Sequence, residues 1–222
     1  MGSLASVPAL RALAPGALVA LAARARPARF TAGTVLRPAG EVARSVVFLL
    51  SGTVVATHVG PAGTEIWPEQ WTGPAVVDKA AVLDGGPPAT GLTAFTAISV
   101  RLLDRAGFLD LLEREPSVRT HVLAQLARDA MAGRRRLIHA VTLPAVAQVA
   151  LWLARPGADP DVVWRGTQEQ LAHLLGLSRV TVNRALARLV RAGAIELTVR
   201  GVVVTDRSRL VVFAGDAETP GR

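Results

Sequence analysis

The segment Ser178–Arg191 carries side chains that can grip flat, acceptor-rich surfaces. It contains four arginines and no acidic residue. Its first two turns hold Arg179, Thr181, Asn183 and Arg184. A guanidinium presents a fixed fork of N–H donors that binds two acceptors at once, and an amide can donate and accept side by side. Such a set is typical of contacts to phosphates and to the edges of heterocyclic bases.

Two short helices are predicted to position this segment. Thr167 can cap the first helix, and Gln170, three residues later, completes a capping box. Gly176 ends that helix, and Ser178 caps the second one. The inward positions at helical spacing are Leu171, Leu174 and Leu175 in the first helix and Val182, Ala185, Leu186, Leu189 and Val190 in the second. The pattern predicts a helix-turn-helix, with an αα-hairpin inside some other fold as the alternative.

The stretch GAIELTVRGVVVTD follows the second helix and contains two β-capable runs, with Arg200 and Gly201 at the apex. It predicts a wing hairpin, which makes the unit a winged helix. A helix N-terminus in the major groove places arginine beside guanine O6 and N7, and asparagine beside adenine. Ser178, Thr181 and Arg200 are expected to meet phosphates. Double-stranded DNA is the partner that fits, and the candidate contacts are Thr167, Gln168, Ser178, Arg179, Val180, Thr181, Asn183, Arg184, Arg188 and Arg200.

The composition agrees with a polyanionic partner. The formal net charge of the 222 residues is +8, carried almost entirely by arginine because Lys79 is the only lysine. A sequence bias toward Ala, Arg, Val and Gly, such as a GC-rich genome imposes, would look similar. The absence of cysteine excludes disulfides, cysteine-ligated zinc, iron–sulfur clusters and thiol catalysis.

Other chemistry finds little support. The four histidines show no metal-ligand spacing, and His58 is the one candidate for a haem sensor. No nucleophile elbow, Walker loop or paired-carboxylate motif is present. We therefore predict no catalytic residues, no metal site, no cofactor and no enzyme activity.

The N-terminus and the hydropathy predict a soluble, cytoplasmic chain. MGSLAS fits a myristoylation pattern only loosely and could be a cloning remnant, and ALAPGALVALAA lacks a clean signal-peptide cleavage site. An amphipathic helix leading into the first domain is the preferred interpretation. No run approaches the roughly 18 apolar residues of a membrane span.

Between Phe30 and Leu103 the sequence alternates short β-rich runs with Gly and Pro. The expected strands are 34–36, 45–50, 53–59 and 97–103. This texture predicts an all-β sandwich or barrel. Trp67 and Trp71, beside Pro68, are expected in a loop, either as core residues or as an aromatic wall for an apolar or planar ligand.

A long helix is predicted over Ser117–Val141, introduced by Pro116. Its narrow apolar seam, Leu123, Leu126, Ala130, Gly133, Leu137 and Ala140, has the three-and-four spacing of a coiled coil. We expect a homodimer interface there, with packing on the chain's own β-domain as the alternative. The run Arg134–Arg136 is expected to be a solvated face.

The order of these parts resembles the cyclic-AMP receptor/FNR (Crp/Fnr) family of bacterial transcription regulators. The β-roll signature stands as Phe30, Gly33, Leu36, Gly40 and VVFLLSGTV at 46–54. The DNA-binding signature stands as Thr167, Gln170, Leu171, Gly176, Leu177, Ser178, Arg179, Thr181, Val182 and Arg184. The resemblance implies an α+β fold: a β-roll (jelly roll) effector-like domain with its N-terminal helix at 1–107, a dimerisation helix and hinge at 108–141, and a winged helix-turn-helix at 142–222.

The resemblance also implies a homodimer that binds a two-fold symmetric operator and activates or represses transcription. RNA polymerase and an unidentified small-molecule effector remain open partners. Val180 stands where many members have a glutamate that accepts from a cytosine, so the operator should differ from theirs.

The effector cassette, which is the family's phosphate-binding run of Gly-Glu followed ten residues later by Arg-Ser-Ala, departs further from the family pattern. The family's Gly-Glu falls on Val77-Asp78, and its Arg-Ser-Ala on Pro88-Ala89-Thr90. Because the anchoring arginine and serine are replaced by Pro88 and Ala89, we predict that cyclic AMP does not control this chain. The candidate effector pocket is Trp67, Trp71, Asp78, Pro88 and Ala89, and the alternative function is a β-roll sensor of a non-nucleotide small molecule.

Overall fold

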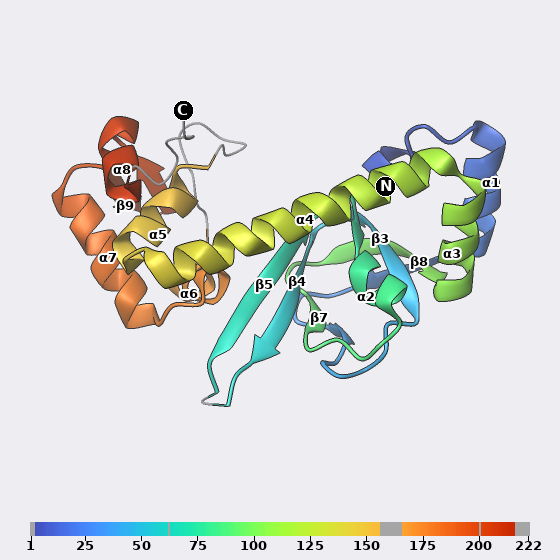
Figure 1. Ribbon diagram of the computed structural model, residues 1–222, viewed down its shortest axis with the longest axis horizontal. Helices are drawn as coiled ribbons and strands as arrows, with labels where there is room; N and C mark the ends of the chain where they lie inside the picture. The colour runs from blue at the N-terminus through green and yellow to red at the C-terminus, as the bar shows by residue number, and fades with distance from the viewer. Residues whose placement is uncertain (1–2, 62, 156–165, 200, 216–222) are drawn as a thin grey trace. The chain divides into compact units, whose positions relative to one another are not determined.

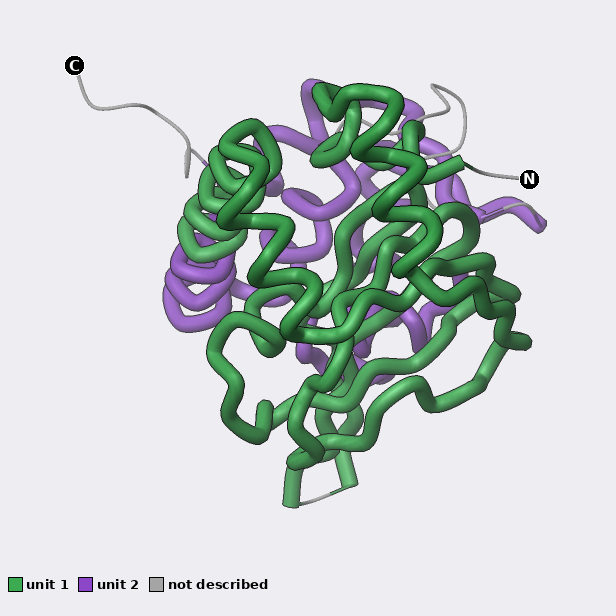
Figure 2. The backbone as a smooth tube through the Cα atoms, turned by 90° about the vertical axis from the view of Figure 1, so that its right-hand side faces the viewer, with its two compact units in different colours: residues 1–131 green, residues 132–222 purple. Residues whose placement is uncertain are grey.

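The computed structural model describes residues 3–61, 63–155, 166–199 and 201–215. The chain divides into two compact units, Met1–Met131 and Ala132–Arg222, coloured green and purple in Figure 2. This division falls within helix α4 (Pro116–Thr142), so the expected boundaries after residues 107 and 141 stay predictions. Within the described ranges, no helix is long and apolar enough to cross a membrane.

The first unit begins with helical segments that pack on a β-roll. Two 3₁₀ turns, η1 (Leu4–Ser6) and η2 (Pro8–Leu10), precede α1 (Pro15–Arg24). Pro15 lies in the first turn of α1, where its missing N–H costs no hydrogen bond. A helix therefore stands before the β-rich region, as the sequence predicts.

The roll consists of two antiparallel four-stranded sheets, with strand orders β1-β8-β3-β6 and β2-β7-β4-β5 (Figure 1). The strands are β1 (Arg26–Phe30), β2 (Val35–Arg37), β3 (Ser45–Ser51), β4 (Thr53–Val59), β5 (Glu65–Thr72), β6 (Ala75–Val77), β7 (Gly91–Ala94) and β8 (Ile98–Asp104). The four strands expected from the sequence are present as β2, β3, β4 and β8. The remaining strands were not predicted, because they are short or carry polar and proline residues.

Strand β5 corrects the prediction of a loop around Trp67 and Trp71. It lies at the edge of its sheet, where the missing N–H of Pro68 is tolerated. Ala56 pairs with Glu69 and His58 with Ile66, so two residues of β5 oppose a single residue of β4. This bulge changes which face of the sheet each later side chain occupies.

Apolar side chains from both sheets meet in one core between them. The buried members are Val47, Leu49, Val54, Val77, Leu92, Ala94, Ile98 and Val100. A second core lies between the outer surface of β3 and the helices, around Phe48 and Phe108. Gly52 turns the chain from β3 to β4 with φ of 88°, and a Cβ there would lie 2.4 Å from the carbonyl oxygen of Ala97, so only glycine fits.

Helix α2 (Lys79–Asp84) lies between β6 and β7, and helices α3 (Arg105–Arg114) and α4 follow β8. Helix α4 begins one residue before the predicted helix and ends one residue after it. Val118 and Val122 of α4 are buried against the roll. The Lys79 ammonium, with a side chain 5% exposed, donates to Asp129 of α4 at 2.8 Å. Leu126 is half-buried and packs partly on the same core.

The second unit is a small winged helix. Its elements after α4 are α5 (Ala145–Leu153), α6 (Gln168–Leu175), α7 (Arg179–Arg191), β9 (Ile195–Thr198), β10 (Gly201–Val204) and α8 (Arg207–Ala214). Leu171, Val182, Leu186 and Leu189 are fully buried together with Leu153 and Leu210. Val190 is 39% exposed, so its expected inward position is wrong, whereas the other predicted inward residues of α7 are buried.

Candidate nucleic-acid interface and effector pocket

The two helices of the DNA-binding motif begin at the predicted caps. Thr167 Oγ1 accepts from the backbone N–H of Gln170 at 3.2 Å, and the Gln170 side chain accepts from the N–H of Thr167 at 2.9 Å. Gly176 ends α6 in the left-handed conformation, with φ of 67°. Ser178 Oγ accepts from the N–H of Thr181 at 3.1 Å. Local side-chain chemistry therefore fixes where α7 starts.

The side of α7 opposite its buried face is open to solvent. Arg179, Val180, Asn183 and Arg184 are all exposed, with Val180 at 58%. Thr181 is half-buried, and its hydroxyl lies 2.8 Å from that of Ser178. The structure therefore brings the predicted base-contacting side chains onto one accessible surface, while Ser178 and Thr181 also serve as the helix cap.

The remaining predicted DNA contacts differ in their surroundings. Thr167 is exposed and Gln168 is half-buried at the start of α6. The guanidinium of Arg188 lies 5.6 Å from the ring centroid of Phe213, a cation–π arrangement that holds it against α8. Strands β9 and β10 form the predicted wing. Arg200, predicted at the apex of the hairpin, lies outside the described residues.

Further arginines concentrate positive charge in this unit. Desolvation is the main cause that lowers the pKa of Arg155, and the positive charges of Arg136 and Arg135 lower it further. Arg155 is exposed, yet its neighbours remove part of its hydration. Arg134, Arg135 and Arg136 are exposed, as expected of a solvated face. The charge of the winged helix is therefore not confined to α7.

In the first unit, the structure does not bring Trp67 and Trp71 into one pocket. Trp67 meets Phe95 edge-on, with ring centroids 5.1 Å apart, and lines a hollow with Thr57. Trp71 lies opposite Val54 and lines a different hollow beside His121. The bulge in β5 places the two rings apart, so they do not form the aromatic wall that was the alternative to core residues.

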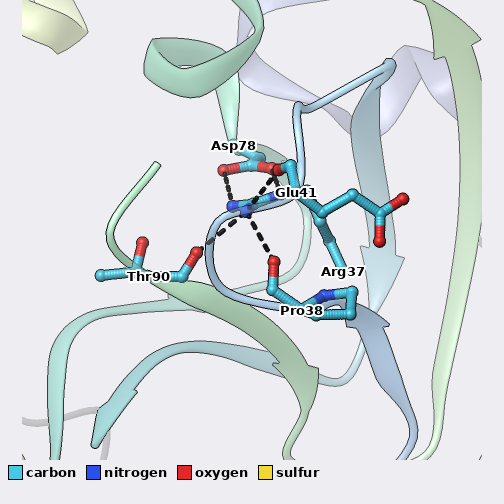
Figure 3. A network of polar contacts seen from close by, with 5 residues as sticks. All are labelled: Arg37, Pro38, Glu41, Asp78 and Thr90. Carbon is cyan, nitrogen blue, oxygen red and sulfur yellow. Dashed lines mark hydrogen bonds and ion pairs between the residues drawn. The ribbon is translucent and has the colours of Figure 1, made fainter. Parts of the chain in front are cut away.

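Asp78 lies in the interior of the roll, where it is bound by an arginine that the sequence analysis missed. Arg37 Nε and Nη2 donate to the Asp78 carboxylate at 2.9 and 3.1 Å. Arg37 Nη1 donates to the backbone oxygens of Pro38, Glu41 and Thr90 at 3.2, 3.2 and 2.9 Å (Figure 3). No spacing rule links Arg37 to Asp78, which follows it by 41 residues.

The backbone oxygens of Pro88 and Ala89 are engaged by other residues of the roll. The Pro88 oxygen accepts from the N–H of Gly40 at 2.8 Å, and the Ala89 oxygen lies 3.0 Å from His58 Nδ1. His58 is thus engaged within the roll. Among the described residues, no group of three or more His, Cys, Asp or Glu side chains could hold a metal.

Comparison with known families identifies both units. Residues 27–115 match the model for a cyclic nucleotide-binding domain, and residues 145–213 match that for a Crp-like helix-turn-helix domain. The chain belongs to the Crp/Fnr family of transcription regulators. The predicted Crp/Fnr membership and fold are confirmed. This family consists of regulators rather than enzymes.

Relatives of this Crp/Fnr regulator span its length. A CRP-like cAMP-activated global transcriptional regulator of Mycobacterium tuberculosis is 26% identical over 204 residues, covering 88% of this chain and 91% of that protein. The catabolite activator protein of Thermus thermophilus is 24% identical with a TM-score of 0.54, over 93% and 98% of the two chains. The c-di-GMP responsive regulator CLP of Xanthomonas campestris is 17% identical with a TM-score of 0.73, over 86% and 99%.

Proposed function

We propose that this Crp/Fnr regulator acts as a homodimer on an inverted-repeat operator and does so without cyclic AMP. The observation that carries the DNA-binding part is the exposed, acid-free face of α7, on which Arg179, Asn183 and Arg184 stand over a fully apolar inner face. Base-edge contacts by this face would specify the operator, and Arg200 would contact phosphate. The bound dimer would then change the access or recruitment of RNA polymerase.

The apolar surface of α4 supports a homodimer. Leu123, Met131, Leu137, Ile138 and Val141 are all more than half exposed. Leu123, Ala130 and Leu137 recur at seven-residue intervals, the spacing of a coiled-coil seam. Exposed apolar side chains in such number on one helix are typical of a protein interface. The seam that we propose therefore keeps Leu123, Ala130, Gly133 and Leu137 and omits Leu126.

The chemistry around Asp78 supports independence from cyclic AMP. A cyclic phosphate requires donors, whereas Pro88 and Ala89, at the positions of the family's arginine and serine, have no side-chain donor. Proline has no N–H to donate. Losing one charge-assisted bond to a phosphate forfeits about 1.5–3 kcal/mol, roughly ten- to a hundredfold in affinity. The effectors named for the Mycobacterium and Xanthomonas relatives, cAMP and c-di-GMP, differ from each other, so an effector does not follow from the fold.

Selection of binding sites from random DNA by the purified full-length protein tests this function. We expect inverted repeats with half-site centres about one helical turn, ~34 Å, apart. Equal affinity for single half-sites would contradict the dimer. Titration calorimetry with cyclic AMP and cyclic GMP should show no saturable binding. A micromolar dissociation constant with a matching gain in operator affinity would refute the independence from cyclic nucleotides.

A further inference from the structure

Arg37 lies in the interior of the roll beside Asp78, the residue at the position of the family's cassette glutamate. Its side chain is 8% exposed and that of Asp78 is 10% exposed. A small cavity of about 170 Å³ beside them is lined by both residues and by apolar side chains such as Leu36 and Leu92. Sites for small molecules usually enclose roughly 300–1,000 Å³. Little room is therefore left for an added ligand.

The groups that surround the Arg37 guanidinium are all acceptors. The carboxylate of Asp78 takes two N–H groups in a bidentate pair. Three backbone oxygens face the third nitrogen, from Pro38, Glu41 and Thr90. These acceptors come from three separate parts of the chain: the loop after β2, the residue before α2, and the residue before β7. A shell of this kind fits a planar cation with several N–H donors and repels an anion.

Asp78 itself is held in an unusual state. Its φ is 61°, and among the described residues it is the only non-glycine residue with a positive φ. It precedes α2 at the N-cap position, yet its carboxylate makes no capping hydrogen bond. Aspartate is a preferred N-cap residue, so a conformation that forgoes the cap needs a competing partner. The bidentate bond to Arg37 is that partner.

We propose that Arg37 is a built-in ligand of the effector pocket, and that this pocket is selective for a guanidinium cation instead of an anionic nucleotide. The Arg37 guanidinium links the loop after β2, Asp78 and the segment before β7 through its hydrogen bonds. Without it, a bound effector would have to link these three parts. The inference rests on the proposed function in one respect: a pocket filled by the chain itself explains why DNA binding needs no cyclic AMP.

Chemical rescue of the full-length Arg37→Ala protein tests this proposal. Guanidinium or methylguanidinium, at low millimolar concentrations where their denaturing action is negligible, should raise the Tm of Arg37→Ala by mass action. Sodium, tetramethylammonium and cyclic AMP should not, because they lack the planar set of donors. The matched control is Arg101→Ala, which also removes a part-buried arginine bonded to backbone oxygens, those of Ala22 and Ala25, but frees no carboxylate.

If Arg37→Ala accumulates as insoluble protein, the yield of soluble protein on refolding with and without methylguanidinium becomes the readout. Arg37→Lys retains the positive charge but loses the planar fork of N–H donors. This variant should be soluble, less stable than the wild type, and unaffected by guanidinium. A double variant, Arg37→Met with Asp78→Leu, removes both charges and should show no rescue.

A Tm or yield that guanidinium raises equally in Arg37→Ala, Arg101→Ala and the double variant would overturn the built-in ligand. These measurements contain no DNA, so a negative result would count against the pocket assignment and not against the proposed DNA-binding function. Wild-type protein that selects no operator, while Arg37→Ala is still rescued, would refute the function and leave the pocket assignment standing.

Discussion

Individual arginine side chains on α7 differ in what they can contact. Arg184 is exposed and has no acidic neighbour within its helix, whereas Arg188 is held over the ring of Phe213. A side chain that is free to reach a base edge can distinguish sequences, and one that meets phosphate cannot. We therefore predict that Arg184 contributes sequence specificity, and we propose that Arg200 contributes general affinity through phosphate.

Arg184→Ala should weaken binding to the best operator by about 1–3 kcal/mol and relax base preference at one position. Arg200→Ala should weaken binding to all sequences and reduce the salt slope by about one. Fluorescence anisotropy over a panel of operators at several salt concentrations measures both effects. Arg191→Ala, in the last turn of α7, is the control. If the Arg184 and Arg200 variants behave alike across the panel, this division of roles is wrong.

Asp110 provides a pH-dependent contribution to stability in the first unit. Its hydrogen bond with Arg24 is the main cause that lowers its pKa, followed by the one with Arg114. A carboxyl group with a lowered pKa stabilises the folded state above its unfolded pKa, about 3.9. That stabilisation is lost as the pH falls through the folded value.

Asp110→Asn should therefore lower the Tm at neutral pH, and the difference from the wild type should shrink as the pH falls below about 4. Thermal unfolding between neutral pH and the acid limit of solubility measures it, and added salt should reduce the effect. Glu113→Gln, an exposed neighbour on the same helix, is the control. A difference that stays constant down to the lowest pH would mean that the ion pairs do not contribute.

At the scale of the elements, the helix-turn-helix depends on where its two helices begin. Four orphan N–H groups open every helix. In α6 the capping box satisfies the N–H groups of Thr167 and Gln170, and in α7 Ser178 satisfies that of Thr181. The start of α7 also decides which side chains stand in its first two turns. A cap residue here affects both stability and DNA contact.

Two substitutions of Ser178 separate these effects. Ser178→Ala removes the cap and should cost about 1 kcal/mol of stability. Ser178→Asp keeps a capping oxygen and places a favourable negative charge at the helix N-terminus, so its stability should match the wild type. That charge would face phosphate, so Ser178→Asp should lose operator affinity. Urea unfolding and anisotropy measure the two quantities, and a stable Ser178→Ala protein would show that the cap is dispensable.

At the scale of the whole molecule, dimerisation decides whether two recognition helices can read one operator. The exposed apolar face of α4 includes Leu123, Leu137 and the small Ala130, which would let two helices approach closely. Because a two-fold axis places each residue near its own copy, a charge introduced there meets a like charge.

Ala130→Glu should cost about 3–5 kcal/mol of dimer stability, since it buries unpaired like charges. Sedimentation at several protein concentrations measures it. Arg128→Gln changes the net charge by the same amount at an exposed position off the seam and should leave the dimer intact. An Ala130→Glu protein that stays dimeric at low micromolar concentration would place the interface elsewhere.

The sequence by itself determined the local features of the DNA-binding unit. Thr167, Gln170, Gly176 and Ser178 set the ends of α6 and α7 through hydrogen bonds and backbone conformations that involve residues within one turn. Helical spacing then identified four of the five inward positions of α7. Such features can be predicted because propensity, capping and periodicity act over a few residues.

Only the tertiary structure decided the contents of the roll. The fold brings Arg37 to Asp78, 41 residues away, and Lys79 to Asp129, 50 residues away. It also separates Trp67 from Trp71, because the register of an edge strand and its bulge depend on the neighbouring strand rather than on local spacing. Contacts of this kind arise from sheet pairing and packing between distant segments, so the residue that fills the effector pocket could not be identified before the strands were placed.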